Sequence, residues 1–239
     1  MLAALNCLWA MKRFLLLFTG VLMCAYFSKA QGYLSDVQFD KVGQLEVAQY
    51  VQVQMNNNTA TFMDVKPSLE PTASIDGFRF HEREYIVKDS LLKVWSHYIH
   101  TNPSVAWNAS RFSFGLLYSK NSNQLVYPNE YVDGIDAGQI IYLNLHVLKL
   151  KKLATAFEIT TVDTNDKVIE FSYVADNITH GKQQLSFSQT RKGYTKITHR
   201  TYFKSQSVLR DHFLYPYFHT RLANTYHRNM KRIYKAAGE

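Results

Sequence analysis

Apolar and polar residues alternate most regularly in the second half of the chain. Four runs there are rich in β-branched and aromatic residues and are separated by turn-forming residues, which predicts antiparallel strands over 157–162, 167–175, 182–189 and 194–203. After Pro216 the apolar residues recur at helical spacing, which predicts one long helix. Its apolar stripe is Phe218, Leu222, Tyr226, Met230 and Ile233. A sheet and a helix with one apolar face each bury those faces most simply against each other.

The middle of the chain adds a second set of elements. Alternation over 78–87 predicts a strand, and a short helix is expected to begin after Asp89 or Ser90 and to stop before Asn102. A second short helix is expected over 103–107, since Pro103 suits a first helical turn. Strands are expected over 113–118 and 139–150, joined by the loop 120–137. The predicted order is strand, two short helices, strands and long helix, which is an α+β arrangement.

The segment before residue 78 has a weaker pattern. Residues 44–55 have the composition of a strand, with Val51, Val53 and Met55 alternating with glutamines. Residues 66–77, which contain Pro67, Pro71 and the turn-forming pair Asp76-Gly77, are expected to be a linker. We therefore expect residues 31–77 to be an N-terminal extension and linker, and residues 78–236 to be a single domain.

Residues 1–30 have the features of a signal peptide. An uncharged, mainly apolar run over 14–27 follows Lys12 and Arg13 and precedes Ser28-Lys29-Ala30, a site for cleavage after Ala30. The run is shorter than the ~20 apolar residues of a membrane span. The sequence thus predicts export to a periplasmic or extracellular location, with translation starting at Met1 or Met11. Both cysteines, Cys7 and Cys24, lie in this segment, so the mature chain is expected to hold no disulfide.

Several short motifs carry a resemblance to a known superfamily. They are Phe171-Ser172-Tyr173, the segment from Gly181 through Lys182-Gln183-Gln184 to Phe187, Thr201-Tyr202-Phe203, and Pro216 entering a basic helix with Arg228 and Tyr234. On these residues the chain resembles the START-like (SRPBCC) superfamily, and within it an uncharacterised bacterial and plant family of START-like domains. The resemblance implies a helix-grip fold, in which a curved antiparallel sheet grips a long C-terminal helix. It also implies an apolar cavity between sheet and helix, and no mechanism.

Candidate chemistry is sparse. None of the sequence motifs for phosphate binding, zinc proteases, nucleophile elbows or thiol redox sites occurs. His97 and His100 share a helix face but lack a third metal ligand, and His212, His219 and His227 are expected to flank the terminal helix. The chain therefore predicts neither a metal nor another cofactor. The net charge of +8 is moderate, and no nucleic-acid partner is expected.

The predicted sheet and helix indicate where a ligand would lie. On the strand 194–203, residues 197, 199, 201 and 203 share one face, while Lys196 and Arg200 mark the opposite face as solvated. Aromatic residues of neighbouring strands would share the cavity with His199, which would hydrogen-bond a polar ligand head. The candidate ligand-binding residues are Phe171, Tyr173, Phe187, His199, Thr201, Phe203, Phe218 and Tyr226.

Three functions remain open from the sequence. The first is a non-catalytic binding protein that holds a small hydrophobic or amphipathic molecule between sheet and helix. The second is an enzyme that uses His199 and Tyr173 as acid and base in the same cavity. The third is a structural protein that docks on an anionic membrane surface through the basic face of the terminal helix, formed by Arg221, Arg228, Lys231 and Arg232.

Overall fold

The computed structural model describes residues 32–147 and 152–237. From Gly32 onward the chain forms one compact unit. The expected signal peptide, residues 1–30, lies outside the described residues, so its cleavage and the export of the protein stay predictions.

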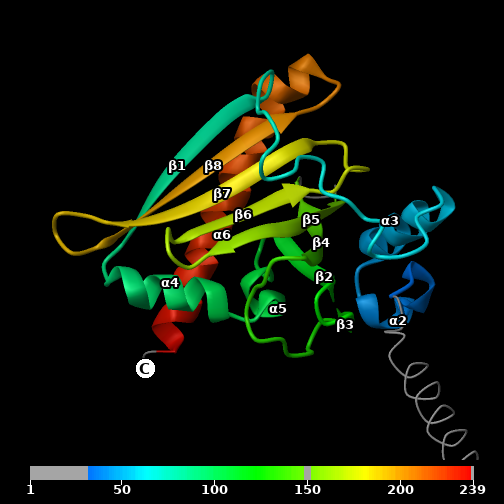
Figure 1. Ribbon diagram of the computed structural model, residues 1–239, viewed down its shortest axis with the longest axis horizontal. Coiled ribbons are helices and arrows are strands. Elements are labelled where there is room, and N and C mark those ends of the chain that lie inside the picture. The colour runs from blue at the N-terminus through cyan, green and yellow to red at the C-terminus, as the bar shows by residue number, and fades with distance from the viewer. Residues whose placement is uncertain (1–31, 148–151, 238–239) are drawn as a thin grey trace, which may run out of the picture. The chain divides into compact units, whose positions relative to one another are not determined.

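One antiparallel sheet dominates the described chain (Figure 1). Its strands are β1 (Arg79–Val87), β2 (Phe112–Ser119), β3 (Gln124–Val126), β4 (Gln139–His146), β5 (Lys152–Asp163), β6 (Val168–Tyr173), β7 (His180–Gln189) and β8 (Thr195–Lys204). The strand order is β1-β8-β7-β6-β5-β4-β2-β3. The strands expected from residue 78 onward are confirmed, and β3 adds a short strand inside the expected loop 120–137. The strand expected over 139–150 ends at His146, and residues 148–150 lie outside the described residues.

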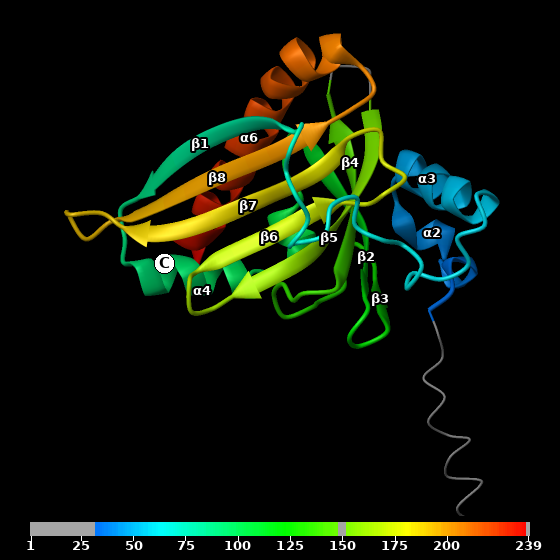
Figure 2. The same cartoon turned by 45° about the horizontal axis from the view of Figure 1, so that its top comes forward.

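The helices lie on both sides of this sheet. They are the 3-10 helix η1 (Leu34–Asp36), α2 (Phe39–Val42), α3 (Leu45–Asn56), α4 (Leu91–His100), α5 (Pro103–Ala106), the π-helical turn η2 (Arg210–Leu214) and α6 (Tyr215–Ala236). The long helix α6 crosses one face of the curved sheet behind β1, β8 and β7 (Figure 2). With α4 and α5 following β1, this is the helix-grip α+β fold expected from the sequence.

The main core lies between the inner face of the sheet and helices α4, α5 and α6. Trp95 and Tyr98 of α4 meet the ring of Phe187 edge-on, with centroids 5.2 and 5.0 Å away. Trp107, just after α5, stacks on Tyr226 of α6 at 4.2 Å. The alternation of β8 is as expected, because Ile197, His199, Thr201 and Phe203 are all buried. Aromatic packing thus joins the three helices to the sheet.

The expectation of a strand over residues 44–55 is wrong, because this segment forms helix α3. Val47 and Val51, one helical turn apart, are fully buried against the outer face of the sheet, whereas Val53 is 50% exposed. Helix α3 approaches the sheet at a bulge in β2, between Phe114 and Leu116. A β-carbon on Gly115 would lie 2.8 Å from both methyl groups of Val47, so the absence of a side chain there permits this close contact.

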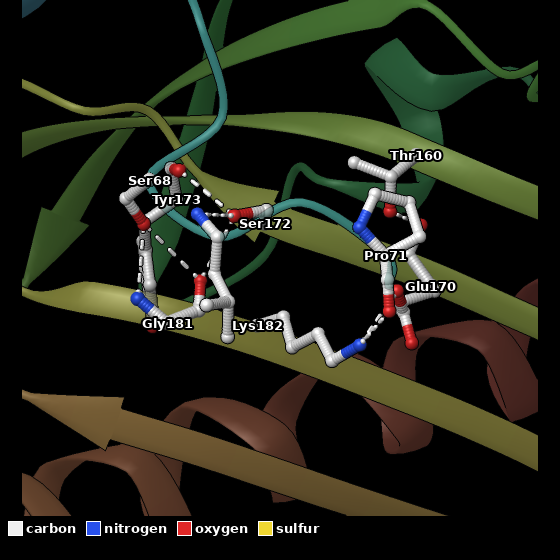
Figure 3. Close-up of polar contacts among 9 residues, drawn as sticks. Ser68, Pro71, Thr160, Glu170, Ser172, Tyr173, Gly181 and Lys182 are labelled. Carbon is white, nitrogen blue, oxygen red and sulfur yellow. Dashed lines mark hydrogen bonds and ion pairs between the residues drawn. The ribbon is translucent and has the colours of Figure 1, made fainter. Parts of the chain in front are cut away.

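The residues expected as a linker also pack on the outer face (Figure 3). The backbone N–H of Ser68 donates to the carbonyl of Tyr173 at 2.6 Å, at the end of β6. The ammonium group of Lys182 donates to the Pro71 carbonyl at 2.7 Å and pairs with Glu170 at 3.2 Å. Both charged side chains are buried, and their mutual pairing satisfies the requirement that buried charges have partners. The segment therefore covers β6 and β7 rather than crossing solvent.

Helix α6 presents the expected amphipathic pattern with one change. Tyr226 and Met230 are buried, whereas Phe218, Leu222 and Ile233 are only partly buried. The other buried residues of this face are Tyr215, His219, Ala223, Thr225, His227 and Asn229. The four residues of the basic face are all exposed. The buried face of α6 is therefore more polar than its apolar stripe suggested.

Candidate ligand-binding cavity

An apolar cavity of about 570 Å³ lies between the inner face of the sheet and α6. Its walls come from β4, β5, the β6–β7 connection, η2 and α6, and include Leu145, Leu153, Ile178, Phe218 and Leu222. A second space of about 50 Å³ is lined by aromatic residues such as Trp107, Phe157 and Tyr226. The two spaces share the wall residues Leu145, Thr155, Tyr173, His219 and Leu222. The larger volume is within the range of about 300–1,000 Å³ found for small-molecule pockets.

The eight candidate residues divide into two groups. Phe171, Tyr173, His199, Phe218 and Tyr226 line one or both spaces. The other three, Phe187, Thr201 and Phe203, are not part of either wall.

Each residue of the second group has a packing role instead. Phe187 contacts Trp95 and Tyr98, as described above. The hydroxyl of Thr201 lies 3.2 Å from His219 Nε2, and Phe203 stacks on Tyr215 at 3.9 Å. Thr201 and Phe203 therefore support cavity-lining side chains of α6 without lining the cavity.

A buried chain of polar side chains runs along the inner wall, centred on Gln183 of β7. The amide oxygen of Gln183 lies 2.8 Å from His199 Nε2 and 2.9 Å from His219 Nε2. Its amide nitrogen donates to the Tyr173 hydroxyl at 3.0 Å, which lies 2.8 Å from the Tyr215 hydroxyl. An amide oxygen only accepts hydrogen bonds, so both histidines donate through Nε2.

This arrangement determines which ring nitrogens of the other buried histidines carry protons. His199, protonated on Nε2, accepts on Nδ1 from His227 Nε2 at 3.1 Å. His227 then accepts on Nδ1 from the Tyr98 hydroxyl at 2.9 Å. His219, in contrast, keeps Nδ1 as a free acceptor, since this atom is buried and has no partner among the described residues. The side chain of His219 lines both spaces.

Burial keeps these histidines neutral. Desolvation, reinforced by the neighbouring imidazoles, holds the pKa values of His199 and His219 well below the usual value. Desolvation and His219 lower the pKa of His227 to about 3. Burial also raises the pKa of Tyr173 and of Tyr215. At neutral pH these buried histidines and tyrosines are therefore uncharged hydrogen-bonding groups.

Two histidines differ from the expectation that they flank the helix. His219 and His227 are buried on the inner face of α6, because Gln183 and His199 supply partners from the sheet. His212 is exposed, as a flanking residue would be, and its Nδ1 lies 3.3 Å from a guanidinium nitrogen of Arg79. Local helical spacing does not show which flank a distant strand will cover.

The histidines expected on one face of a short helix lie on α4, and His97 has a structural partner. Nε2 of His97 lies 2.8 Å from the Met230 carbonyl, so this histidine links α4 to α6. The described part of the chain contains no group of three or more His, Cys, Asp or Glu side chains placed to hold a metal ion. Within the same residues, no helix has the length and apolar character needed to cross a membrane.

Sequence reasoning missed most of the residues that line the two spaces, among them the polar residues Gln183, Arg210 and Tyr215. Gln183 was detectable, because it shares its strand face with Leu185 and Phe187 and must point inward with them. It also separates the proposed acid and base, since it lies between His199 and Tyr173. Arg210 in η2 lines the cavity, where one guanidinium nitrogen bonds to the Thr179 hydroxyl. The other, Nη1, is buried without a partner among the described residues.

These features define the class of the structure as a helix-grip α+β fold with a cavity between the sheet and the long C-terminal helix. No protein-family model matches the chain, and no curated protein matches it.

Among solved structures, the chain is similar to the KanY protein, with 9% identity, a TM-score of 0.49, and coverage of 66% of this chain and 99% of that chain. It is also similar to major latex-like protein 151 from Panax ginseng, with 12% identity, a TM-score of 0.48, and coverage of 66% and 97%. A norcoclaurine synthase point mutant from Thalictrum, in complex with a transition-state analogue, gives 11% identity, a TM-score of 0.48, and coverage of 68% and 97%.

Proposed function

We propose that this protein binds a small hydrophobic or amphipathic molecule in the cavity between the sheet and α6. The observation that carries the proposal is the cavity of about 570 Å³, which is lined by leucine, valine, isoleucine, alanine and phenylalanine side chains on one hand and by polar residues on the other. The polar residues of the wall are Thr155, Tyr173, Asn177, Thr179, Arg210, Tyr215 and His219. Such walls favour an apolar ligand body, and a few placed polar groups orient it. On the basis of the expected signal peptide, we place this binding after export.

The polar chain around Gln183 supports binding rather than proton transfer. His199 uses both ring nitrogens in hydrogen bonds to Gln183 and His227, so neither is directed at a ligand. The larger cavity is lined instead by His219, whose Nδ1 has no partner among the described residues, and by Tyr215. Burial holds the pKa of His219 well below the usual value, so this imidazole is a weak base that orients a ligand hydroxyl by accepting its hydrogen bond.

A fluorescence titration with the uncharged apolar probe N-phenyl-1-naphthylamine tests the proposal. We expect saturable binding of one probe per chain. Leu222→Trp places an indole in a wall shared by both spaces and is expected to weaken binding at least about tenfold, equal to about 1.4 kcal/mol. Leu92→Trp is the matched control, because Leu92 on α4 is 69% exposed and outside the cavity.

The titration has outcomes that reject the proposal. Probe fluorescence that rises without saturation would show only nonspecific partition onto exposed apolar surface. Equal affinities of the wild type and Leu222→Trp would place the probe outside the cavity. The Leu92→Trp variant should bind as the wild type does.

A second candidate function is docking on an anionic membrane surface. It is favoured by the exposed basic face of α6 and by exposed apolar side chains just before and at the start of the same helix, Phe213, Leu214 and Tyr217. Basic residues beside apolar ones bind anionic lipid through charge attraction and interfacial burial. Leu214 also lines the cavity, so a membrane docked there would meet the cavity wall.

A further inference from the structure

We propose that the ligand carries a carboxylate, and that Arg210 binds it inside the cavity. This inference rests on the proposed function, since it names the chemical class of the molecule that the cavity holds. The occupant would be an amphipathic monocarboxylic acid, with its apolar body against the leucine-rich wall and its acidic head toward η2.

Arg210 lacks the partner that its charge requires. Its Nη1 atom is buried and forms no hydrogen bond within the described residues, while the other terminal nitrogen contacts only the Thr179 hydroxyl. The adjacent carboxylate is not available, because both oxygens of Asp211 accept hydrogen bonds from Ser205 at 2.6 and 2.8 Å. Buried arginines are rarely left unpaired, because removing a charge from water is costly.

The described part of the cavity wall contains no acidic side chain that would neutralise this charge. Among the described residues that line the larger space, Arg210 is the only lysine or arginine, and there is no aspartate or glutamate. A guanidinium presents a planar fork of N–H donors that matches the two oxygens of a carboxylate. Because the guanidinium of Arg210 is the one charged group of this described wall, it selects one acidic group on an otherwise uncharged molecule.

Neighbouring hydroxyls add to the same site. Tyr173 and Tyr215 line the cavity with Arg210, and their hydroxyls are 2.8 Å apart. The positive charge of Arg210 partly offsets the rise that burial causes in the pKa of both tyrosines, as expected of a nearby cation. When Tyr173 donates to Tyr215, the Tyr215 proton is free to donate to a carboxylate oxygen beside the guanidinium.

Two probes of equal chain length test the head group. Decanoate and 1-decanol would each displace N-phenyl-1-naphthylamine at pH 8, below their aggregation concentrations. We expect the wild type to bind decanoate at least about tenfold more tightly than decanol, as befits a charge-assisted hydrogen bond. Arg210→Met should abolish this preference by weakening decanoate binding while leaving decanol within about twofold of its wild-type value. Arg191→Met, at an exposed arginine in the β7–β8 turn, is the control and should behave as the wild type.

The outcomes separate the head-group inference from the proposed function. If the uncharged probe fails to bind the wild type saturably, the proposed function itself is wrong. Should the probe bind while decanoate and decanol displace it equally, the cavity stands and the carboxylate assignment is overturned. An undiminished preference for decanoate in Arg210→Met would also overturn the role of Arg210. Retained binding of probe and decanol by this variant shows that it is folded.

Discussion

Replacing Gln183 with methionine tests the buried polar chain most sharply. Gln183 is 8% exposed and its amide makes three hydrogen bonds, to His199, His219 and Tyr173. Methionine has a similar length but neither a carbonyl oxygen nor an amide nitrogen, so the substitution removes all three bonds while filling nearly the same space.

The loss of these hydrogen bonds would affect the three former partners of Gln183 unequally. His219 keeps its contact with Thr201, and Tyr173 keeps its bond to Tyr215. The Nε2–H of His199 has no second partner among the described residues, so it would be a buried donor without an acceptor. An orphaned buried donor costs about 1–3 kcal/mol, and a lost hydrogen bond between groups that keep another partner about 0.5–1.5 kcal/mol. We therefore expect Gln183→Met to lower the free energy of unfolding by about 2–6 kcal/mol.

Urea unfolding followed by far-ultraviolet circular dichroism measures this change, as a shifted midpoint at an unchanged slope. Gln184→Met is the matched control, since Gln184 is the next residue of β7 and its side chain makes no hydrogen bond in the described structure. This control should change the free energy of unfolding by less than about 0.5 kcal/mol. Equal midpoints for the two variants would refute the hydrogen-bonded chain.

Three further perturbations address other parts of the structure. Folding lowers the pKa values of His199, His219 and His227, so the unfolded chain takes up protons at a higher pH than the folded protein does. The free energy of unfolding should therefore be greatest above about pH 7 and fall as the pH is lowered toward about 5.5, by up to about 1.4 kcal/mol per pH unit for each histidine. Urea midpoints that stay constant over this range would contradict the neutral cluster. Gly115→Ala should destabilise the fold by about 1–3 kcal/mol, because its methyl group would overlap Val47; an unchanged midpoint would argue against the docking of α3. Changing the basic face of α6 to glutamine should reduce sedimentation with phosphatidylserine vesicles and leave phosphatidylcholine controls unaffected; equal sedimentation would reject membrane docking through this face.

The strands and the terminal helix were predictable because their periodicity matches their burial. β8 alternates between buried and more accessible positions, and its inward residues, from Ile197 to Phe203, are those that the sequence indicated. The segment 44–55 was wrongly predicted to be a strand because Val51, Val53 and Met55 occur at every second position, as in a strand. The same segment also satisfies a helical period through Val47 and Val51, and contact with the outer face of the sheet favours the helix.

The polar part of the site was less accessible to sequence reasoning. His219 and His227 are buried only because Gln183 and His199, on strands distant in sequence, provide hydrogen bonds to them. Such pairing is a property of the assembled layers, and no local pattern on α6 encodes it. Arg210 is similar, since its position in the cavity wall depends on how η2 turns into α6.

The most direct measurement of the central claim is methyl NMR during titration with N-phenyl-1-naphthylamine. Leu145, Leu153 and Leu222 line the cavity, whereas Leu34 and Leu116 are fully buried in the separate outer core. Binding between the sheet and α6 predicts saturable shifts of the first three leucines, with the other two unchanged. Shifts centred on Leu34 and Leu116, or no saturable shift of the cavity leucines, would contradict the proposal that this fold holds its ligand between sheet and helix.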